Sequence, residues 1–314
     1  PFFFFTQSPH YEILSGLVGS EMCIRDRVPN CRRASQEFPR LETILTDSQM
    51  DGCSLMPPRA IMALSGGMDS TSLLLRLLRE GYSVTCVSYL YGQKHSIEIS
   101  KATENIERLQ AKGLPVEQKI IDLTSAMSSF HSALTNEDFE IPEGHYEEVQ
   151  MKQTVVPNRN AIFSSILYGM GLSISQKEDC NVTIALGVHS GDHAIYPDCR
   201  PEFYNALSTA FQIGNWNSER IRFELPYIEG NKTTILKDAL RSCDILNLDF
   251  NEIMRSTITS YNPDISGRSS GKSGSDVERI LAFHEIGHVD PIEYTSSWET
   301  VLENALKLKN KVGE

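Results

Sequence analysis

Short apolar segments alternate with longer amphipathic segments along most of the chain, beginning near residue 59. Apolar runs rich in β-branched residues predict buried strands, and apolar positions three and four residues apart predict helices. We therefore expect strands at 59–64, 83–90, 116–123, 181–188 and 221–227, and helices at 71–78, 97–109, 160–173, 233–242 and within 201–211. This alternation predicts an α/β, Rossmann-like fold with a mostly parallel sheet covered by helices on both faces. Ligands bind such sheets at the carboxyl ends of the strands.

Two stretches lie outside this pattern. Residues 124–155 are acidic and irregular, which is typical of a long insertion or lid. Residues 1–27 lack an initiator Met and the layout of a signal peptide, and residues 21–27, EMCIRDR, resemble the translation of a transposon-end sequencing adapter. We interpret residues 1–55 as an artefactual or disordered extension before a natural start at Met50 or Met56, with a genuine variable extension as the alternative. Neither interpretation gives these residues a function.

Composition narrows the classes of partner. The net charge of −12 over 314 residues disfavours non-specific binding to nucleic acid or to an anionic membrane. The seven cysteines are scattered without a C-x-x-C pair, which is typical of reduced thiols in the cytoplasm. No apolar run approaches the roughly 20 residues that a membrane helix needs.

The segment SGGMDS, residues 65–70, stands where a predicted strand leads into a predicted helix. Glycines let a backbone approach an anion closely, and a helix N-terminus offers N–H donors and a positive dipole end. Serine and threonine hydroxyls add donors, and a carboxylate can hold Mg²⁺ or orient a pyrophosphate. An ordinary glycine turn with Ser70 as the N-cap is the alternative. The segment predicts an ATP phosphate site made of Ser65, Gly66, Gly67, Met68, Asp69, Ser70 and Thr71.

Cations, acids and aromatic residues on later predicted strand ends and loops could complete a site. Arginine and lysine can neutralise a carboxylate and phosphates in an acidic protein. Carboxylates can accept hydrogen bonds from the N–H groups of a guanine-like edge, and tyrosines can stack on a purine. Taken singly, each is explained by a surface salt bridge or a packed aromatic ring. Taken together they favour a binding site, with Arg159, Arg200 and Lys232 as cations, Asp192 and Asp198 as acids, and Tyr91 and Tyr196 as stacking groups.

The phosphate segment resembles the PP-loop of the N-type ATP pyrophosphatases, and four further blocks resemble the QueC family of 7-cyano-7-deazaguanine synthases. The blocks are YLYGQKHSIEI (89–99), VVPNRNAIF (155–163), GVHSGDHAIYPDCRPEF (187–203) and LPYIEGNKTTIL (225–236). The resemblance spans residues 61–294, and Leu90 departs from it because an acid is usual there.

The resemblance implies a PP-loop domain over residues 56–260, with residues 261–314 as a helical segment packed on it. It implies a cytoplasmic ligase that converts 7-carboxy-7-deazaguanine and ammonia to 7-cyano-7-deazaguanine, with ATP and Mg²⁺, releasing AMP and pyrophosphate. An acyl-adenylate would give an amide, and a second adenylation would give the nitrile. The implied catalytic residues are Asp69, Lys232 and Arg200, and the implied substrate-binding residues are Tyr91, Gln93, His95, Arg159, Asn160, Asp192, Tyr196, Asp198 and Arg200.

Several alternatives stay open at this point. The ligase could stop at the amide, or pass the activated acid to another amine as defence-associated relatives do. A nucleotide-binding protein without catalysis is a third possibility. Whether the chain acts as a monomer or a homodimer is open as well.

The segment GRSSGKSGSD, residues 267–276, imitates a Walker A phosphate loop but has three residues between its glycines where four are needed. It fits instead the QueC zinc segment with its four cysteine positions held by Ser260, Ser270, Ser273 and Asp276. Serine hydroxyls are poor zinc ligands. We therefore expect no structural zinc, a loop held by serine hydrogen bonds, and Asp276 as the N-cap of the next helix.

The segment HEIGH, residues 284–288, has the spacing of a zinc peptidase. Such a site needs both histidines on one helical face and a third ligand downstream. Gly287 is a predicted helix C-cap and Pro291 follows, so we expect His288 to lie past the helix end. This disfavours a metallopeptidase, and a zinc recruited by His284, His288 and Asp276 is a speculative option.

Overall fold

A computed structural model describes residues 57–92, 97–130, 132, 155–192, 196–258 and 267–312, with the backbone alone for Asp192, Lys311 and Val312. All of the described residues belong to the unit formed by residues 54–314. The interpretation of residues 1–55, and most of the predicted lid at 124–155, fall outside the described residues.

The described part of the chain forms one five-stranded sheet in which each neighbouring pair is parallel, in the order β3-β2-β1-β4-β5. The strands are β1 (Arg59–Ala63), β2 (Ser83–Leu90), β3 (Val116–Asp122), β4 (Val182–Ala185) and β5 (Ile221–Glu224). The chain adds β2 and β3 on one side of β1, and then returns to add β4 and β5 on the other. The point between β1 and β4 is therefore the topological switch point, where the loops after the two strands diverge.

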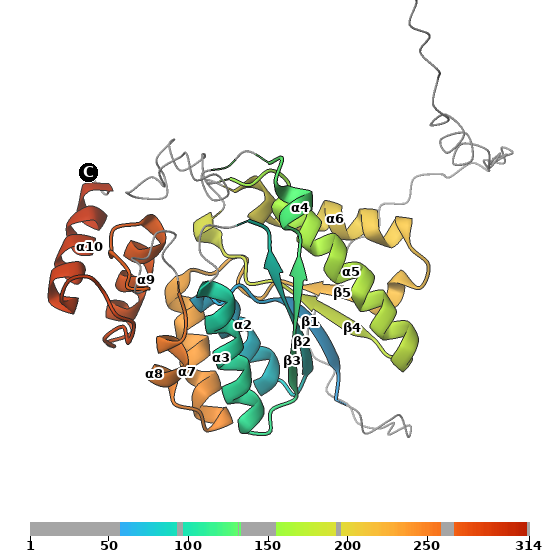
Figure 1. Ribbon diagram of the computed structural model, residues 1–314, viewed down its shortest axis with the longest axis horizontal. Helices are drawn as coiled ribbons and strands as arrows, with labels where there is room; N and C mark the ends of the chain where they lie inside the picture. The colour runs from blue at the N-terminus through green and yellow to red at the C-terminus, as the bar shows by residue number, and fades with distance from the viewer. Residues whose placement is uncertain are drawn as a thin grey trace, which may run out of the picture. The chain divides into compact units, whose positions relative to one another are not determined.

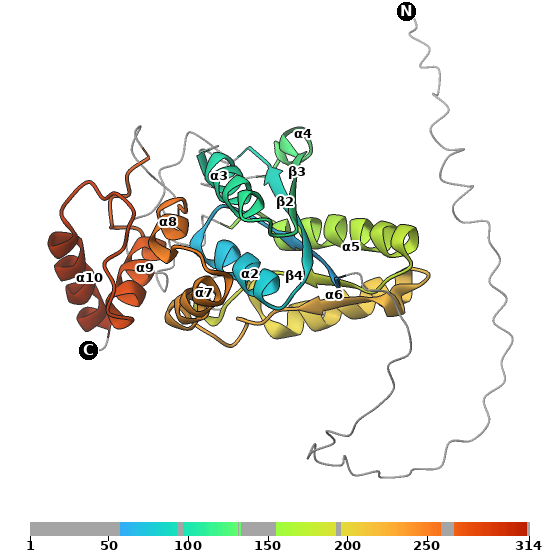
Figure 2. The ribbon, with the colours of Figure 1, turned by 90° about the horizontal axis from the view of Figure 1, so that it is seen from below.

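Helices cover both faces of this sheet (Figures 1 and 2). Because side chains alternate along a strand, Ala60 and Met62 of β1 face one layer while Ile61 faces the other. The first layer contains α2 (Met68–Arg79), α3 (Ile97–Ala111), α7 (Lys232–Leu246) and α8 (Phe250–Arg255), and the second contains α5 (Arg159–Glu178) and α6 (Pro201–Gly214). The predicted α/β fold with a parallel sheet and two helical layers is confirmed.

The predicted elements exist, but several boundaries differ. Helix α2 begins at Met68, three residues before the predicted start, because the glycine turn closes directly into the first helical turn. Its N-cap is Gly67, so the alternative with Ser70 as N-cap is wrong. Strands β4 and β5 are each four residues long and end before residues 186–188 and 225–227, which the prediction had included. The short helices α4 (Thr124–Met127) and α8 are not among the elements predicted from the sequence.

The C-terminal part of the described chain holds α9 (Gly274–Glu285) and α10 (Trp298–Val312). Helix α9 contacts α7 and α10. Phe283 of α9 is fully buried in the cluster that also contains α2 and α7 side chains, and its ring lies 6.1 Å from that of Phe250. Helix α9 thus packs on the same layer as the helix that begins with Lys232. Within the described residues, no helix is long and apolar enough to cross a membrane.

Candidate functional site

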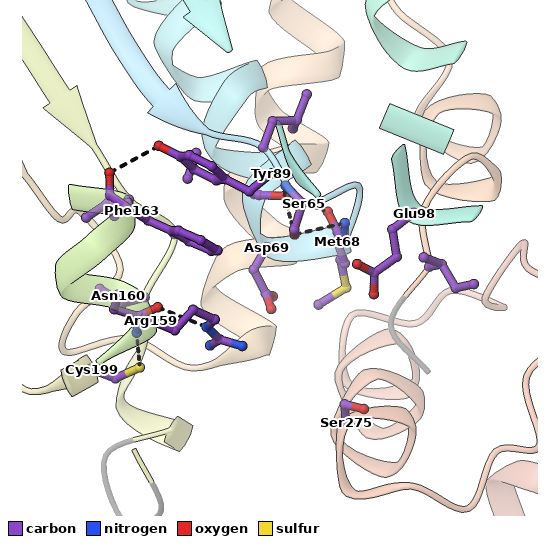
Figure 3. Close-up of a pocket in the computed structure, with 18 of the residues that line it drawn as sticks. Ser65, Met68, Asp69, Tyr89, Glu98, Arg159, Asn160, Phe163, Cys199 and Ser275 are labelled. Atoms are coloured by element: carbon purple, nitrogen blue, oxygen red, sulfur yellow. Dashed lines mark hydrogen bonds between the residues drawn. The ribbon is translucent and has the colours of Figure 1, made fainter. Parts of the chain in front are cut away.

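A cavity of about 240 Å³ opens at the carboxyl ends of β1, β2 and β4. Ala63 and Leu64 line it from the end of β1, Tyr89 and Tyr91 from the end of β2, and Leu186–Val188 from the loop after β4. This is the switch point of the sheet, where α/β folds bind ligands because diverging loops leave a crevice. Figure 3 shows the side chains that converge on this cavity.

The loop predicted to bind phosphate forms one wall of the cavity. Its turn is held by its own serines, because Ser65 N–H donates to Ser70 Oγ (3.2 Å) and Gly67 N–H donates to Ser65 Oγ (3.3 Å). Gly66 has φ +84, a conformation that side chains with a Cβ disfavour. None of the described side chains caps the N-terminus of α2. The loop is therefore preformed around a helix N-terminus that faces the cavity, which suits an anion.

Lys232 faces this loop from the first position of α7. It is buried, at 6% exposure, and its Nζ donates to Asp69 Oδ2 at 2.9 Å. His189 Nε2 lies 3.3 Å from the same ammonium and Glu278 Oε2 lies 3.7 Å from it. A buried cation at the positive end of a helix is unfavourable by itself, so the carboxylates around it provide the compensation. The ammonium is thereby held beside the start of α2.

His189 is oriented by the loop that carries it. Gly191 N–H donates to its Nδ1 at 3.1 Å, and the ring presents its Nε2 to Lys232 and Asp69. That nitrogen lies 3.7 Å from Asp69 Oδ2. Lys232 of α7 and His189 of the loop after β4 therefore both lie beside the Asp69 carboxylate.

The electrostatics of Asp69 favour its ionised form. Burial alone would raise the pKa of this carboxyl, but the charges of Lys232 and His189 outweigh burial and hold the pKa below its ordinary value. Its second oxygen, Oδ1, is buried and accepts no hydrogen bond from the described residues. A buried carboxylate oxygen without a donor suits a hard cation such as Mg²⁺, which takes one or two protein carboxylates and completes its shell with phosphate and water.

Arg159 and Asn160 enter the cavity from the start of α5. The backbone N–H of Asn160 donates to Asp198 Oδ2 at 3.4 Å, and its side-chain amide donates to the sulfur of Cys199 at 3.4 Å. These contacts tie α5 to the η3 turn (Pro197–Cys199), so the segments around residues 159 and 199 are positioned together although they are far apart in sequence.

Aromatic rings line the cavity next to these polar groups. The rings of Tyr89 and Phe163 stack with their centroids 4.0 Å apart, and the ring of Tyr91 meets Phe163 at its edge. Tyr91 also interacts with the guanidinium of Arg159. One end of the cavity thus carries the charged pair of Asp69 and Lys232, and the other end carries the aromatic rings and the guanidinium of Arg159.

The structure brings many of the predicted site residues to the cavity and places others away from it. The cavity is lined by Ser65, Gly67, Met68, Asp69, Ser70, Tyr91, Arg159, Asn160 and Lys232. Gly66 and Thr71 belong to the same loop and helix start without lining the cavity. Tyr196 is 4% exposed and packs with Cys199 and Val188, and Arg200 is exposed at the start of α6, so neither lies along the cavity. Gln93 and His95 fall outside the described residues, as does the side chain of Asp192.

Sequence reasoning missed several residues that line the cavity or hold its lysine. Tyr89, Glu98 and Phe163 line it, and all three stand inside the blocks that carried the resemblance. Ser275 and Ile258 line it from the C-terminal side, and Glu278 of α9 lies beside Lys232. Only the fold brings these last residues to the cavity, because nothing in their local pattern distinguishes them.

The comparison with known proteins agrees with this geometry. Residues 59–287 match the family model described as queuosine biosynthesis protein QueC, which is more than half of the chain. The chain belongs to the QueC family.

Curated relatives extend the match to nearly full-length proteins. The chain is 40% identical to a 7-cyano-7-deazaguanine synthase of Hahella chejuensis over 243 residues, covering 77% of this chain and 96% of the relative. It is 39% identical to a synthase of the same name from Methanoregula boonei over 236 residues, covering 75% and 99%.

Solved structures are more distant. An NMN synthetase from Francisella tularensis has a TM-score of 0.35 at 16% identity, covering 81% of this chain and 85% of that one. A 4-thiouridine synthetase–RNA complex with bound ATP has a TM-score of 0.37 at 15% identity, covering 81% and 53%. Similarity at this level carries no argument about the activity.

Within this QueC-family chain, three of the four positions that the resemblance assigns to zinc cysteines hydrogen-bond to the backbone. Ser273 Oγ accepts from Asp276 N–H (3.2 Å), and an Asp276 carboxylate oxygen accepts from Ser273 N–H (3.4 Å), a reciprocal capping box. The predicted N-cap Asp276 is therefore wrong: Ser273 is the N-cap and Asp276 is the third helical residue. Ser270 Oγ accepts from Lys272 N–H at 3.3 Å, and Ser260 falls outside the described residues.

A buried ion pair supports the same segment. Arg279, fully buried on α9, donates to both carboxylate oxygens of Asp290 at 2.6 and 2.9 Å and to Thr257 Oγ at 2.8 Å. Tyr294 O–H donates to Asp290 Oδ2 at 2.8 Å. Bidentate pairs of this kind fix geometry as well as charge. The expectation that no zinc is present stays a prediction.

The HEIGH segment does not form a two-histidine helical face. Helix α9 ends at Glu285, and Gly287 has φ +75, so His288 lies past the helix end, as predicted. His288 packs its ring against Phe250 at 5.6 Å. Within the described residues, no three His, Cys, Asp or Glu side chains are grouped to hold a metal ion.

Proposed function

We propose that this chain is an ATP-dependent carbon–nitrogen ligase that converts 7-carboxy-7-deazaguanine and ammonia to 7-cyano-7-deazaguanine. Its relatives carry the name of that synthase over nearly their whole length. The observation that carries the proposal is the ion pair between Asp69 and Lys232, 2.9 Å apart, beside an uncapped helix N-terminus at the switch point of the sheet.

The triphosphate would bind along the glycine turn and the first turn of α2. Backbone N–H groups and the hydroxyls of Ser65 and Ser70 supply donors, and Lys232 supplies a full positive charge. Asp69 would hold Mg²⁺ through Oδ1, and the ion would neutralise charge that develops on the phosphates. The ion pair with Asp69 sets Lys232 in position before ATP arrives, and phosphate oxygens can then accept hydrogen bonds from its ammonium group.

The deazapurine acid would occupy the aromatic end of the cavity. The guanidinium of Arg159 faces that space and can pair with the substrate carboxylate. The sequence analysis left this role to Arg159 or Arg200, and we assign it to Arg159 because Arg200 is exposed and does not line the cavity. A carboxylate oxygen held there would lie between the arginine and the phosphates.

In the first half-reaction a substrate carboxylate oxygen attacks the α-phosphorus, and the bond from that phosphorus to pyrophosphate breaks. Ammonia then attacks the acyl carbon, AMP leaves with the electron pair of the C–O bond, and an amide results. A second adenylation, on the amide oxygen, lets AMP leave again with the electron pair of the C–O bond, and the nitrogen loses its two protons as the carbon–nitrogen triple bond forms. The residues contribute position and charge stabilisation, since AMP is already a good leaving group.

The test is to incubate purified protein with ATP, Mg²⁺, ammonium and 7-carboxy-7-deazaguanine, and to identify the products by mass spectrometry. We expect the nitrile, with two AMP released for each nitrile formed. Absence of AMP formation with this acid would contradict the proposal.

A second candidate is a ligase that stops at the amide or joins the acid to another amine. Leu90, the last residue of β2, favours it, because the resemblance expects an acid at this position. The same incubation separates the two candidates: one AMP per amide, with no nitrile, would select the second.

A further inference from the structure

Glu98 is a carboxyl group in the cavity that the proposed mechanism has not used. It stands in the first turn of α3, and its side chain points into the cavity from the side opposite Arg159 and Asn160 (Figure 3). The hydrogen bonds within the phosphate loop do not involve the Glu98 side chain.

The position of Glu98 is coupled to the phosphate loop through the backbone. A Cβ on Gly66 would lie 2.1 Å from the carbonyl oxygen of Glu98, so the start of α3 rests directly on the glycine turn. The turn that receives the phosphates therefore also fixes where the Glu98 side chain begins.

The charged groups around Glu98 come from three other elements. Asp69 on α2, Arg159 on α5 and Lys232 on α7 line the same cavity, and the phenol of Tyr91 lies close enough to interact with the Glu98 carboxylate. Burial raises the pKa of Glu98 to about 7, and the charge of Arg159 offsets only part of this effect. A carboxyl in this condition exchanges its proton near neutral pH, where a proton acceptor is most effective.

The proposed reaction needs such a group. Ammonia that attacks the acyl-adenylate becomes a positively charged nitrogen in the adduct. The adduct can expel AMP and form a neutral amide only when that nitrogen loses one proton. Asp69 is unsuited to accept it, because Lys232 and His189 hold it ionised with a low pKa.

We propose that Glu98 accepts the proton that the attacking nitrogen loses during amide formation, an inference that rests on the proposed function. The nitrogen–carbon bond forms, the bond from the acyl carbon to the AMP oxygen breaks with its electron pair leaving on AMP, and the proton passes from nitrogen to a Glu98 carboxylate oxygen. Solvent then takes the proton from Glu98, and the cycle can repeat.

The decisive variant is Glu98→Gln, which keeps the shape of the side chain but cannot accept a proton. We expect exchange of labelled pyrophosphate into ATP, which reports adenylation of the acid, to stay within about threefold of wild type. We expect amide formation from ammonium at pH 7 to fall about 100-fold, a usual loss for a removed proton acceptor. Wild type should lose activity as the pH falls below about 7, because Glu98 becomes protonated, and this pH dependence should be absent in Glu98→Gln.

A change of nucleophile adds a readout that a structural role would not move. Hydroxylamine is a weaker base than ammonia, so the nitrogen of its adduct is more acidic and loses its proton to solvent with less need for a protein acceptor. Hydroxamate formation by Glu98→Gln should therefore stay close to wild type. Glu98→Asp, which keeps a carboxylate, should recover part of the rate with ammonium.

Glu107→Gln is the matched control, because Glu107 lies on the same helix and is exposed outside the cavity. It should behave as wild type in every assay. A wild-type rate and pH profile in Glu98→Gln would overturn the inference, and so would parallel loss of pyrophosphate exchange and hydroxamate formation. Failure of the wild-type protein to release AMP with this acid would overturn the proposed function itself. That outcome is measured on the wild-type protein, whereas the role of Glu98 is tested on the Glu98→Gln variant, so the two failures are distinguishable.

Discussion

Two glycine- and serine-rich loops in this chain differ in how the helix that follows each of them begins. The first, residues 65–70, and the second, residues 267–276, are both rich in glycine and serine, and both lead into a helix. In the first, no described side chain caps the helix, and the loop lines a cavity at the strand ends. In the second, Ser273 and Asp276 close a capping box on the helix N-terminus.

The difference teaches where phosphate affinity comes from. A helix N-terminus attracts an anion through N–H groups that lack a partner, and a capping box removes that lack. The first loop also receives a buried lysine from α7, whereas Lys272 in the second loop is exposed. Glycine and serine content alone therefore does not identify a phosphate site. We expect phosphate affinity at the first loop because it lies at the switch point and no described side chain caps the helix that follows it.

The largest expected effect comes from Asp69→Ala. Removing the carboxylate leaves Lys232 beside His189 without its ion pair to Asp69 and removes the candidate Mg²⁺ ligand. We expect AMP release to fall by about 100-fold or more, in line with the loss of one preorganised electrostatic group. Steady-state assays of AMP formation check this.

Lys272→Ala in the second loop is the matched control for that change. It should leave AMP release and nucleotide affinity unchanged, because Lys272 is exposed and far from any strand end in sequence. A loss of ATP binding in Lys272→Ala would show that the second loop is the phosphate site after all.

The next largest effect is expected when alanine replaces a glycine of positive φ in the first loop. Gly66→Ala would add strain at φ +84 and drive a Cβ to 2.1 Å from a backbone carbonyl. We expect at least about a tenfold loss in ATP affinity, equivalent to about 1.4 kcal/mol, because the loop and the start of α3 must move apart. Titration with a fluorescent ATP analogue measures it.

Gly271→Ala meets a different neighbour, since its Cβ would lie 2.8 Å from Val301 Cγ1, a side-chain atom on α10. We expect a lower Tm with unchanged ATP affinity. Equal loss of affinity in the two variants would mean that strain spreads through the whole molecule and that the loops are not independent.

A smaller effect should follow from Ser273→Ala. Losing an N-cap hydroxyl costs about 1 kcal/mol of unfolding free energy, which corresponds to a fall of roughly 2–4 °C in Tm for a domain of this size. KM for ATP should not change. Thermal denaturation followed by circular dichroism checks the stability, and Ser273→Thr, which retains a capping hydroxyl, should keep most of it.

The smallest expected effect is that of a chelator. Among the positions that the resemblance assigns to zinc cysteines, Ser270, Ser273 and Asp276 hydrogen-bond to the backbone, so we predict that prolonged treatment with a chelator leaves Tm unchanged. Elemental analysis of the purified protein should find no stoichiometric zinc. A Tm that falls on chelation and recovers with zinc would refute this prediction.

Much of the fold was predictable because its signals are local. The apolar segments around β1 and β2 are buried on both faces and read as strands from hydrophobicity alone. The end of α9 before His288 was predictable from Gly287, because a glycine in the left-handed region ends helices. The start of α2 was misplaced by three residues, since a glycine turn and a first helical turn have the same polar, small-residue pattern.

The site was predictable only in part. Its phosphate loop, Lys232 and Arg159 stand in ordered blocks that carry the family resemblance, and the cavity brings them together. Arg200 was placed in the site by its block but lies exposed, because the η3 turn directs Cys199 rather than its neighbour toward the cavity. Glu278 could not be found, since a glutamate on an amphipathic helix is usually a solvated residue.

By itself the sequence determined the alternation of strands and helices and the membership of a family, and it supplied the glycine turn that we propose binds the phosphates of ATP. Each of these is written in residues that lie close together along the chain. Only the tertiary structure decided which charges meet: Asp69 with Lys232 across 163 positions, Glu98 against the glycine turn, and α9 behind the phosphate end. The reason is that electrostatic interactions depend on distance and burial in space. Neither quantity is fixed until the chain has folded and β4 has paired with β1.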